Sequence, residues 1–353
     1  MNLLDWAHRS IRRLLLATPL LAACADTNAP LPEPQAVLLV VNSTANTLSI
    51  VPLENPDAAI AVELGGTTPT PVGVFARAGV ALVPLGLDNA VAVVDLRGGT
   101  VLRRIPLPDN SGATGAAIVN DSIAYVANPN RNSVSRVNYL SGETQEVGVG
   151  VFPQGVVFTR GRVFVLNGNL DDTFSPAGPS WITVVDPVTN QRAGGLDSIP
   201  LTGPGNAGFA DVAGDGLLYV VSTGSFFGGE GRLSVVDPVG LTEVASFAGL
   251  GPGPQAVAAG DARVFISSFA EGLLMFDTDS NEVVRGAGEG VPIPSNSGVA
   301  VDRQGRVYAI ESGPCQGGAP GTAHVLDEAL EEIRAIPLGE CSAGATVVEI
   351  PPE

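Results

Sequence analysis

Residues 123–158 read IAYVANPNRNSVSRVNYLSGETQEVGVGVFPQGVVF. Four runs in which apolar and polar residues alternate follow one another in this stretch, namely Ile123–Asn128, Ser133–Asn138, Thr144–Gly150 and Gln154–Phe158. Alternation of this kind is typical of half-buried β-strands, and the Pro, Asn and Gly residues between the runs are typical of turns. The stretch therefore predicts a unit of four antiparallel strands.

The same unit recurs along the chain from Ala36 onward, and three columns of residues define it. The last residue of one run aligns in seven copies, 40 to 51 residues apart, at Pro52, Asp95, Asn138, Asp186, Asp237, Asp277 and Asp327. A bulky residue recurs in the preceding run, at Leu39, Leu82, Tyr125, Phe164, Tyr219, Phe265 and Tyr308. A small residue opens the innermost run, at Gly73, Gly115, Gly155, Gly208, Ala256, Gly298 and Gly344. This period is typical of propeller blades, and small residues suit strands that crowd around a central axis.

The two ends of the repeat region complete each other. The chain enters the repeat at Ala36, on the equivalent of Ile123, so the first copy lacks its innermost run. The run Ala345–Ile350 is an innermost run without a copy of its own. Pairing the two ends would leave no unpaired inner edge. We therefore predict an all-β, seven-bladed β-propeller over residues 36–353, with four antiparallel strands per blade and the C-terminal strand in the N-terminal blade.

Several short motifs resemble the YVTN-type β-propeller repeat. They are YVAN at Tyr125–Asn128, FVLN at Phe164–Asn167, VVDP at Val184–Pro187 and Val235–Pro238, and PQG at Pro153–Gly155. The resemblance covers residues 36–350 and implies the propeller fold, whereas repeats of this type occur in surface-layer, periplasmic and binding proteins of many kinds. The Asn at the end of the first run, Asn128 in the stretch quoted above, is replaced in four copies, by Leu85, Ser222, Ser268 and Glu311. We expect those blades to cap their hairpins differently.

Residues 1–23 have the parts of a bacterial signal peptide. Arg residues near the start are followed by the apolar stretch Leu14–Ala23 and by the sequence Leu21-Ala22-Ala23-Cys24, which looks like a lipobox. We predict a lipoprotein signal peptide at 1–23 and lipid attachment at Cys24. A secretory signal with an incidental Cys is the alternative. An uncleaved anchor does not fit, because about ten apolar residues are too few to span a bilayer.

Residues 24–35 predict a Pro-rich, semi-rigid tether between the lipidated Cys24 and the propeller. Ala25, not Asp, follows the cysteine, and by resemblance to Gram-negative sorting rules this favours the outer membrane. The expected localisation is thus the cell envelope, with the domain facing either the periplasm or the medium.

The charge of the chain excludes several classes of partner and chemistry. Loss of residues 1–23 would leave 15 basic and 35 acidic residues, a formal charge of −20. Nucleic acid and anionic headgroups are poor partners for such a surface. All 18 basic residues are Arg, so neither Schiff-base lysine chemistry nor a P-loop lysine is available. A GC-rich genome and the solubility of an acidic exported protein are sufficient explanations for both features.

Cys315 and Cys341 are the other two cysteines. Cys315 falls between the first and second strand runs of the last copy, counted from its Tyr308 run, and Cys341 falls between its outer run and the closing run. In a propeller these two types of loop lie on one face, which we call the loop face. An exported compartment permits a disulfide between them, and two free thiols or a metal pair are the alternative.

Three of the longest insertions also belong to the loop face, at Gly168–Ser180, Thr223–Gly231 and Gly313–Gly321. The second contains Phe226 and Phe227 in the Gly-rich sequence GSFFGGEG, without an alternating pattern that would bury them. Exposed aromatic residues suit contact with a protein or glycan partner. Packing of the Phe pair onto its own blade is the alternative.

Polar residues precede the small column, where they would line the mouth of the central channel. They are Thr114, Gln154, Gln255 and Ser297, with Asn206 and Asn296 nearby. This neutral set predicts either a site for a small polar ligand or a channel that holds ordered water.

Metal and catalytic motifs are sparse in the sequence. The loop Asn167–Asp172 has oxygen ligands at alternating positions, as Ca²⁺ loops do at their start, but Gly178 takes the place of the acidic twelfth residue. A solvated acidic turn is the alternative to a Ca²⁺ site. Four Asp residues end the same strand in successive copies, which predicts that they cap turns; we call Asp186, Asp237, Asp277 and Asp327 the Asp column. His324 is the one histidine after residue 23, too few for most multi-His or Ser-His systems.

We therefore expect no catalytic residues, no metal site and no cofactor apart from possible Ca²⁺. The expected protein is a monomeric, lipid-anchored, non-catalytic binding or scaffold module for a protein or glycan partner, held on the membrane through Cys24. The alternative function is a divalent-metal-assisted lyase or hydrolase, lactonase-like, on the loop face.

Overall fold

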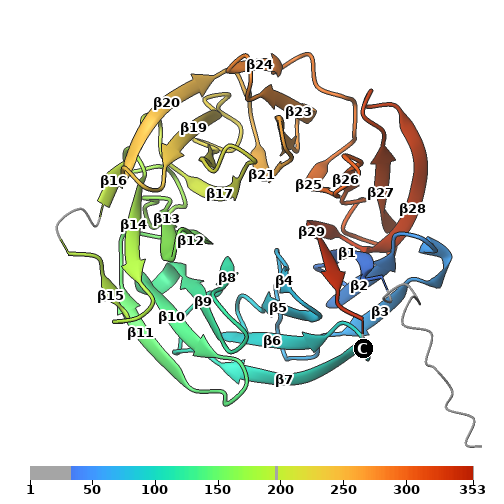
Figure 1. Cartoon of the computed structure of the whole chain (residues 1–353), viewed down its shortest axis with the longest axis horizontal. Coiled ribbons are helices and arrows are strands. Elements are labelled where there is room, and N and C mark those ends of the chain that lie inside the picture. The colour runs from blue at the N-terminus through green and yellow to red at the C-terminus, as the bar shows by residue number, and fades with distance from the viewer. Residues whose placement is uncertain (1–32, 195–197, 353) are drawn as a thin grey trace, which may run out of the picture.

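The computed structural model describes residues 33–194 and 198–352, and seven β-sheets stand around a central axis in it (Figure 1). Six sheets have four antiparallel strands and one has five, because the outer strand of the fourth blade is split in two. The predicted seven-bladed propeller is confirmed. No helix in the described part of the chain is long and apolar enough to span a membrane.

The strands take the same place in every blade. The innermost strands of blades one to seven are β29 (Ser342–Ile350), β4 (Phe75–Arg77), β8 (Ala116–Ile118), β12 (Pro153–Thr159), β17 (Ala207–Val212), β21 (Pro254–Ala259) and β25 (Asn296–Val301). The second strands are β1 (Gln35–Asn42), β5 (Val80–Pro84), β9 (Ile123–Asn128), β13 (Arg162–Asn167), β18 (Leu218–Ser222), β22 (Arg263–Ser268) and β26 (Val307–Glu311).

The outer half of each blade follows the same order. The third strands are β2 (Thr47–Pro52), β6 (Ala90–Asp95), β10 (Ser133–Asn138), β14 (Trp181–Asp186), β19 (Arg232–Asp237), β23 (Gly272–Asp277) and β27 (Pro320–Leu326). The outer strands are β3 (Ile60–Glu63), β7 (Thr100–Pro106), β11 (Thr144–Gly148), β15 (Gln191–Arg192) with β16 (Ser198–Pro200), β20 (Thr242–Ala248), β24 (Glu282–Arg285) and β28 (Glu332–Glu340). Two short 3₁₀ helices, η1 (Pro56–Ala58) and η2 (Pro129–Arg131), lie in loops.

The C-terminal strand β29 completes the first blade, as predicted. It pairs antiparallel with β1 from Gln35↔Ile350 to Asn42↔Ser342, so the first and the last strand of the described residues lie side by side (Figure 1). The strand starts three residues earlier than the expected run 345–350, because Ser342 and Ala343 continue the pairing beyond a bulge. The seam therefore has the same main-chain pairing as the other blades.

Apolar contacts between neighbouring blades form the core. Seven clusters of buried side chains fill the seven blade interfaces, including the seam, where Leu38 and Val40 pack with Tyr308 and Ile310. The bulky column lies in these clusters, and each of its members is at most 4% exposed. Burial of this apolar surface is the main stabilising contribution, and it holds blades together laterally.

The small column marks where inner strands approach one another most closely. A Cβ atom built on Gly115 would lie 2.3 Å from the carbonyl oxygen of Gln154, and one on Gly155 would lie 2.5 Å from that of Gly208. A Cβ on Gly344 would lie 2.5 Å from the carbonyl oxygen of Val72. Most of these residues lie at a β-bulge of the inner strand, because the pairing register shifts there in blades one, four, five, six and seven. The predicted crowding around the axis is confirmed.

Hairpin capping differs among the blades, as the replacements in the Asn column predicted. The Nδ2 atom of Asn128 donates to the hydroxyl groups of Ser133 and Ser135 on the facing strand. In the last blade Glu311 takes the Asn position and His324 takes the position of Ser135. Their side chains contact each other, with 3.0 Å between His324 Nε2 and Glu311 Oε2.

The turn-capping role of the Asp column is also confirmed. The carboxylates of four Asp residues accept hydrogen bonds from backbone N–H groups two to four residues further on, at Asp186, Asp237, Asp277 and Asp327.

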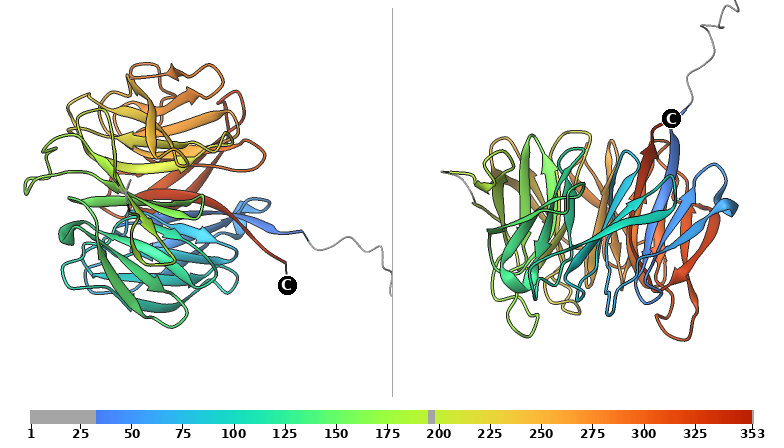
Figure 2. Two further views of the ribbon diagram at one scale, coloured as in Figure 1. Left: turned by 60° about the vertical axis from the view of Figure 1, so that its left-hand side comes forward. Right: turned by 90° about the horizontal axis from the view of Figure 1, so that it is seen from below.

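The two faces of the ring differ in what they carry. Inner strands start at the loop face, where Asn42 pairs with Ser342. Gln35 and Ile350 lie at the other end of the same pair of strands, so β1 and β29 reach the opposite face, which we call the terminal face (Figure 2). The loop face thus lies opposite the start of β1.

The predicted disulfide between Cys315 and Cys341 is present, with 4.3 Å between the two Cα atoms. Cys315 lies in the loop between β26 and β27 of the seventh blade, and Cys341 directly precedes β29. Because β29 belongs to the first blade, the bridge links the first and seventh blades on the loop face.

Candidate functional site

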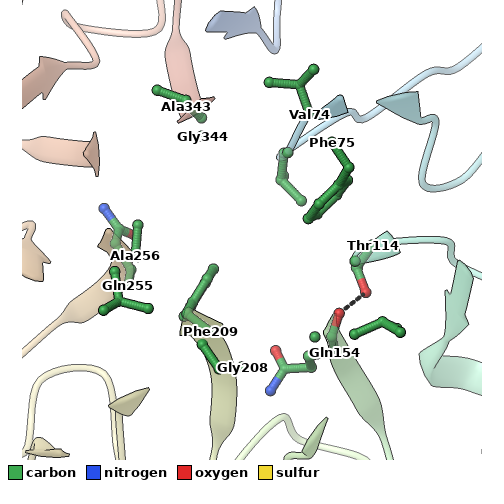
Figure 3. A pocket seen from close by; sticks show the side chains of 18 of the residues that line it. Val74, Phe75, Thr114, Gln154, Gly208, Phe209, Gln255, Ala256, Ala343 and Gly344 are labelled. Carbon is green, nitrogen blue, oxygen red and sulfur yellow. Dashed lines mark hydrogen bonds between the residues drawn. The ribbon is translucent and has the colours of Figure 1, made fainter. Parts of the chain in front are cut away.

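The channel opens on the loop face into a cavity of about 360 Å³ (Figure 3). Every residue of the small column except Gly298 lines it, and residues from all seven inner strands or the loops before them contribute to its wall. Four of the six polar residues predicted for the mouth line this cavity, namely Thr114, Gln154, Gln255 and Ser297. Asn206 and Asn296 are close in sequence to lining residues but do not line the cavity themselves.

Most side-chain donors of these polar residues form hydrogen bonds to the next blade. Thr114 Oγ1 donates to the carbonyl oxygen of Gln154 at 2.9 Å (Figure 3). Gln255 Nε2 donates to the carbonyl oxygen of Asn296 at 3.1 Å, and Ser297 Oγ donates to that of Ser342 at 2.7 Å. These side chains tie blades together, so few of their donors remain for a ligand.

Gln154 and Asn206 form a chain of the same kind. Gln154 Nε2 donates to Asn206 Oδ1 at 2.8 Å, and Asn206 Nδ2 donates to the carbonyl oxygen of Gly224 at 3.0 Å. Asn296 is fully buried, and neither polar atom of its side chain has a hydrogen-bond partner within the described residues.

Apolar residues that sequence reasoning missed dominate the cavity wall. Phe75 and Phe209 both line it and are labelled in Figure 3, and Val72, Val257 and Val299 add to the same wall. Phe209 is 36% exposed although it belongs to an inner strand. Alternation in the sequence identifies both Phe residues only as strand residues, and it does not show that they face the channel.

The channel continues towards the terminal face, where a second cavity of about 510 Å³ is lined by Arg77 and Asp211 among mostly apolar residues. Loss of solvation inside the ring raises the pKa of Asp211 above its ordinary value of 3.8. The N–H groups of Ala259 and Val212, each 2.8 Å from a carboxylate oxygen, oppose this shift. Asp211 therefore links the fifth and sixth blades from within the channel.

Three Phe residues cluster on the loop face across two blades. Phe226 and Phe227 belong to the loop between β18 and β19, and Phe269 to the loop between β22 and β23. The ring centroid of Phe226 lies 5.0 Å from that of Phe227 and 6.1 Å from that of Phe269. Their exposed fractions are 38% for Phe226, 90% for Phe227 and 42% for Phe269. Sequence reasoning found the pair and missed Phe269, which stands alone in a short hairpin loop.

The insertion 168–180 is held by its own polar groups. Asn167 is buried, and its Nδ2 donates to Thr183 Oγ1 and to the carbonyl oxygen of Trp181. Asp171 Oδ1 accepts hydrogen bonds from the Thr173 hydroxyl and from the N–H groups of Ser175 and Thr173, and these bonds hold the pKa of that carboxyl below its ordinary value. Of the oxygen ligands of the hypothetical Ca²⁺ loop, Asp171 Oδ1 is thus engaged in a local turn, whereas Asn167 Oδ1 is buried and accepts no hydrogen bond from the described residues.

The charged groups of the blades pair locally. His324 Nδ1 lies 2.6 Å from Glu332 Oε2, in addition to its contact with Glu311. Within residues 33–194 and 198–352, no group of three or more His, Cys, Asp or Glu side chains is arranged to hold a metal ion. Cys24, the predicted lipid-attachment site, lies outside the described residues.

Comparison with known proteins defines the class but not the activity. No protein-family model matches the chain, and no curated protein matches it. Solved structures do. Hydrazine synthase of Kuenenia stuttgartiensis aligns with a TM-score of 0.64 and 14% identity over 79% of this chain and 90% of that one. A streptogramin B lyase aligns with a TM-score of 0.62 and 13% identity over 80% and 92%.

A third solved structure, virginiamycin B lyase from Staphylococcus aureus, aligns with a TM-score of 0.60 and 13% identity over 78% of this chain and 96% of that one. Identities this low establish a shared fold and nothing about chemistry. The chain is thus a seven-bladed β-propeller that shares its fold with enzymes of different activities.

Proposed function

We propose that the chain is a lipid-anchored β-propeller of the cell envelope that binds a protein or glycan partner on its loop face without catalysing a reaction. The exposed cluster of Phe226, Phe227 and Phe269 is the observation that carries this proposal. Aromatic side chains exposed together are unfavourable in water, and they are common at the centres of binding interfaces.

The arrangement of the two faces supports the same proposal. β1 starts at the terminal face, so a tether that runs from Cys24 to Gln35 would approach the ring from that side. With lipid on Cys24, the loop face would point away from the membrane and towards a partner. The acidic chain disfavours nucleic acid as that partner.

Photo-crosslinking in intact cells tests the proposal. A photoreactive amino acid at position 227 should give discrete adducts, and the same group at Val188, 92% exposed in a turn of the terminal face, is the matched control. Protease and glycosidase treatment of the adducts then separates a protein from a glycan partner. Adducts of equal yield from both positions, or none from position 227, would contradict the proposal.

Replacement of Phe226 and Phe227 by Ser gives a second readout. The double variant should lose the adducts formed from a photoreactive group at Phe269, while its melting temperature stays close to that of the wild type, because both side chains are substantially exposed.

The alternative function, a metal-assisted lyase or hydrolase, is tested by metal analysis. A stoichiometric divalent ion in the purified protein, removed only by chelation, would favour that alternative.

A further inference from the structure

We infer that the loop-face half of the central channel is a binding site for small, uncharged, apolar molecules that carry one hydrogen-bond donor. This site is separate from the Phe226–Phe227–Phe269 cluster. Its cavity of about 360 Å³ lies within the usual range of ligand pockets, and it combines an apolar wall with a few polar groups at one end.

The position of Phe209 in the repeat carries the inference furthest. The equivalent residue, directly after the small column, is aliphatic in the other six blades: Val74, Ala116, Val156, Val257, Val299 and Ala345. Four of these are at most 5% exposed, because they pack between blades. Phe209 instead leaves 36% of its surface accessible at the cavity. Blade packing therefore does not account for an aromatic ring at this place.

A second aromatic side chain adds to the same wall. Phe75 lines the cavity from the second blade and is only partly buried (Figure 3). Val72, 49% exposed, stands at the rim above it. An apolar ligand would cover these surfaces and remove them from water, which is favourable in proportion to the area covered.

The polar groups of the cavity limit the ligand further. The Nε2 atoms of Gln154 and Gln255 are engaged with neighbouring blades, whereas their Oε1 atoms accept no hydrogen bond from the described residues. Both oxygens can accept one from a ligand. No charged side chain lines this half of the channel, so an ionised ligand would lose its hydration without compensation.

Ligand-observed ¹⁹F NMR on the full chain purified in detergent tests the inference. The probe is 5-fluoroindole, which is uncharged and aromatic and has one N–H donor. We expect saturable binding with one site per chain, weaker binding of the N-methylated analogue, and no binding of 4-fluorobenzoate. Phe209→Ser should weaken the affinity by about tenfold. Phe227→Ser, the same exchange outside the channel, should leave it unchanged and thereby controls for partition into detergent.

Two outcomes would overturn the inference. One is equal binding to the wild type and to Phe209→Ser, which would indicate adsorption elsewhere and a channel that holds only water. The other is loss of binding in Phe227→Ser alone, which would move the site to the surface cluster. If Phe209→Ser melts at a clearly lower temperature, Phe209→Leu replaces it, with an expected loss of about threefold.

Discussion

Single residues decide how closely the blades approach. Gly155 has an ordinary backbone conformation, so its requirement is one of space: an added Cβ would meet the carbonyl oxygen of Gly208 at 2.5 Å and Leu166 Cδ1 at 2.7 Å. Both neighbours are fixed in the ring, so the inner strands would have to move apart. The glycine is needed because main-chain atoms of the next blade occupy the space of a side chain.

Gly155→Ala should therefore lower the free energy of unfolding by about 1–3 kcal/mol, the usual cost of overpacking. Gly148→Ala is the matched control, because a Cβ there meets no atom within 4 Å. The control should be neutral or slightly stabilising, since alanine restricts the unfolded chain. Urea denaturation of both variants measures the difference, and equal losses would show that the crowding is not a constraint.

An ion pair near the loop face gives a prediction about pH. Arg131 Nε lies 2.6 Å from Glu146 Oε1, and Ser133 Oγ donates to the same oxygen. The Arg131 hydrogen bond, followed by that of Ser133, lowers the pKa of Glu146 below its ordinary value of 4.5. The ionised carboxylate is thus favoured in the folded state, so its stabilisation is present above pH 4.5 and is lost as the pH falls through the lowered pKa.

Glu146→Gln should cost at most about 1 kcal/mol at pH 7, because both side chains are about one-third exposed and solvent weakens the pair. The difference between wild type and variant should shrink below pH 4. Denaturation curves from pH 7 to pH 3 measure it. A difference that stays constant over this range would contradict the assigned role of Glu146.

At the scale of the strand pair, two solutions to hairpin capping occur in neighbouring blades. The third blade uses Asn128, which donates to Ser135 at 2.9 Å. The second blade has Leu85 and Ala92 at the equivalent positions, and both are fully buried in the core. A hydrogen-bonded polar pair and a buried apolar pair thus occupy equivalent positions in the two blades.

Asn128→Leu alone should destabilise by about 1–3 kcal/mol, because it leaves the Ser135 hydroxyl buried without its partner. Asn128→Leu combined with Ser135→Ala, which reproduces the pair of the second blade, should recover part of that loss. A double-mutant cycle on thermal unfolding measures the coupling. Strictly additive effects would show that the two side chains do not act as a unit.

The strand pattern was predictable from the sequence except where geometry is set by neighbours. Alternation and turn residues located the four runs of residues 123–158 to within a few residues. The split outer strand β15 and β16 was not predictable, because each piece is two or three residues long. The acceptors of Thr114 and Gln255 are carbonyl groups of the next blade, and a carbonyl group has no sequence signature. The sequence therefore predicted the polar residues of the channel mouth, but not that their donors bind carbonyl groups of the next blade.

At the scale of the whole molecule, the disulfide reinforces the seam. Cys315 and Cys341 are 26 residues apart, and their bridge connects the seventh blade to the strand that completes the first. Chain entropy alone predicts a stabilisation of about 3–4 kcal/mol for a loop of this size. Replacement of both cysteines by Ser should lower the melting temperature, and adding a reductant to this variant should not lower it further. An unchanged melting temperature would contradict a stabilising role.

The ring itself was predictable because its repeat is visible in three columns, and its closure followed from the incomplete first copy. The position of Phe269 beside Phe226 was not, since residues 43 apart in the chain meet only through the rotation between blades. Contacts between loops of different blades depend on that rotation and on loop conformation. Candidate binding surfaces on a propeller therefore emerge from the assembled ring.

The pairing of β29 with β1 places Gln35 and Ile350 on one face and the insertions on the other, so the whole account of the two faces depends on it. Amide hydrogen exchange of residues 342–350 tests this pairing most directly. We expect protection comparable to that of β9 and β13, which lie inside complete blades, because β29 pairs with β1 along its whole length. Exchange of this segment as fast as that of an unpaired tail would contradict the closed ring.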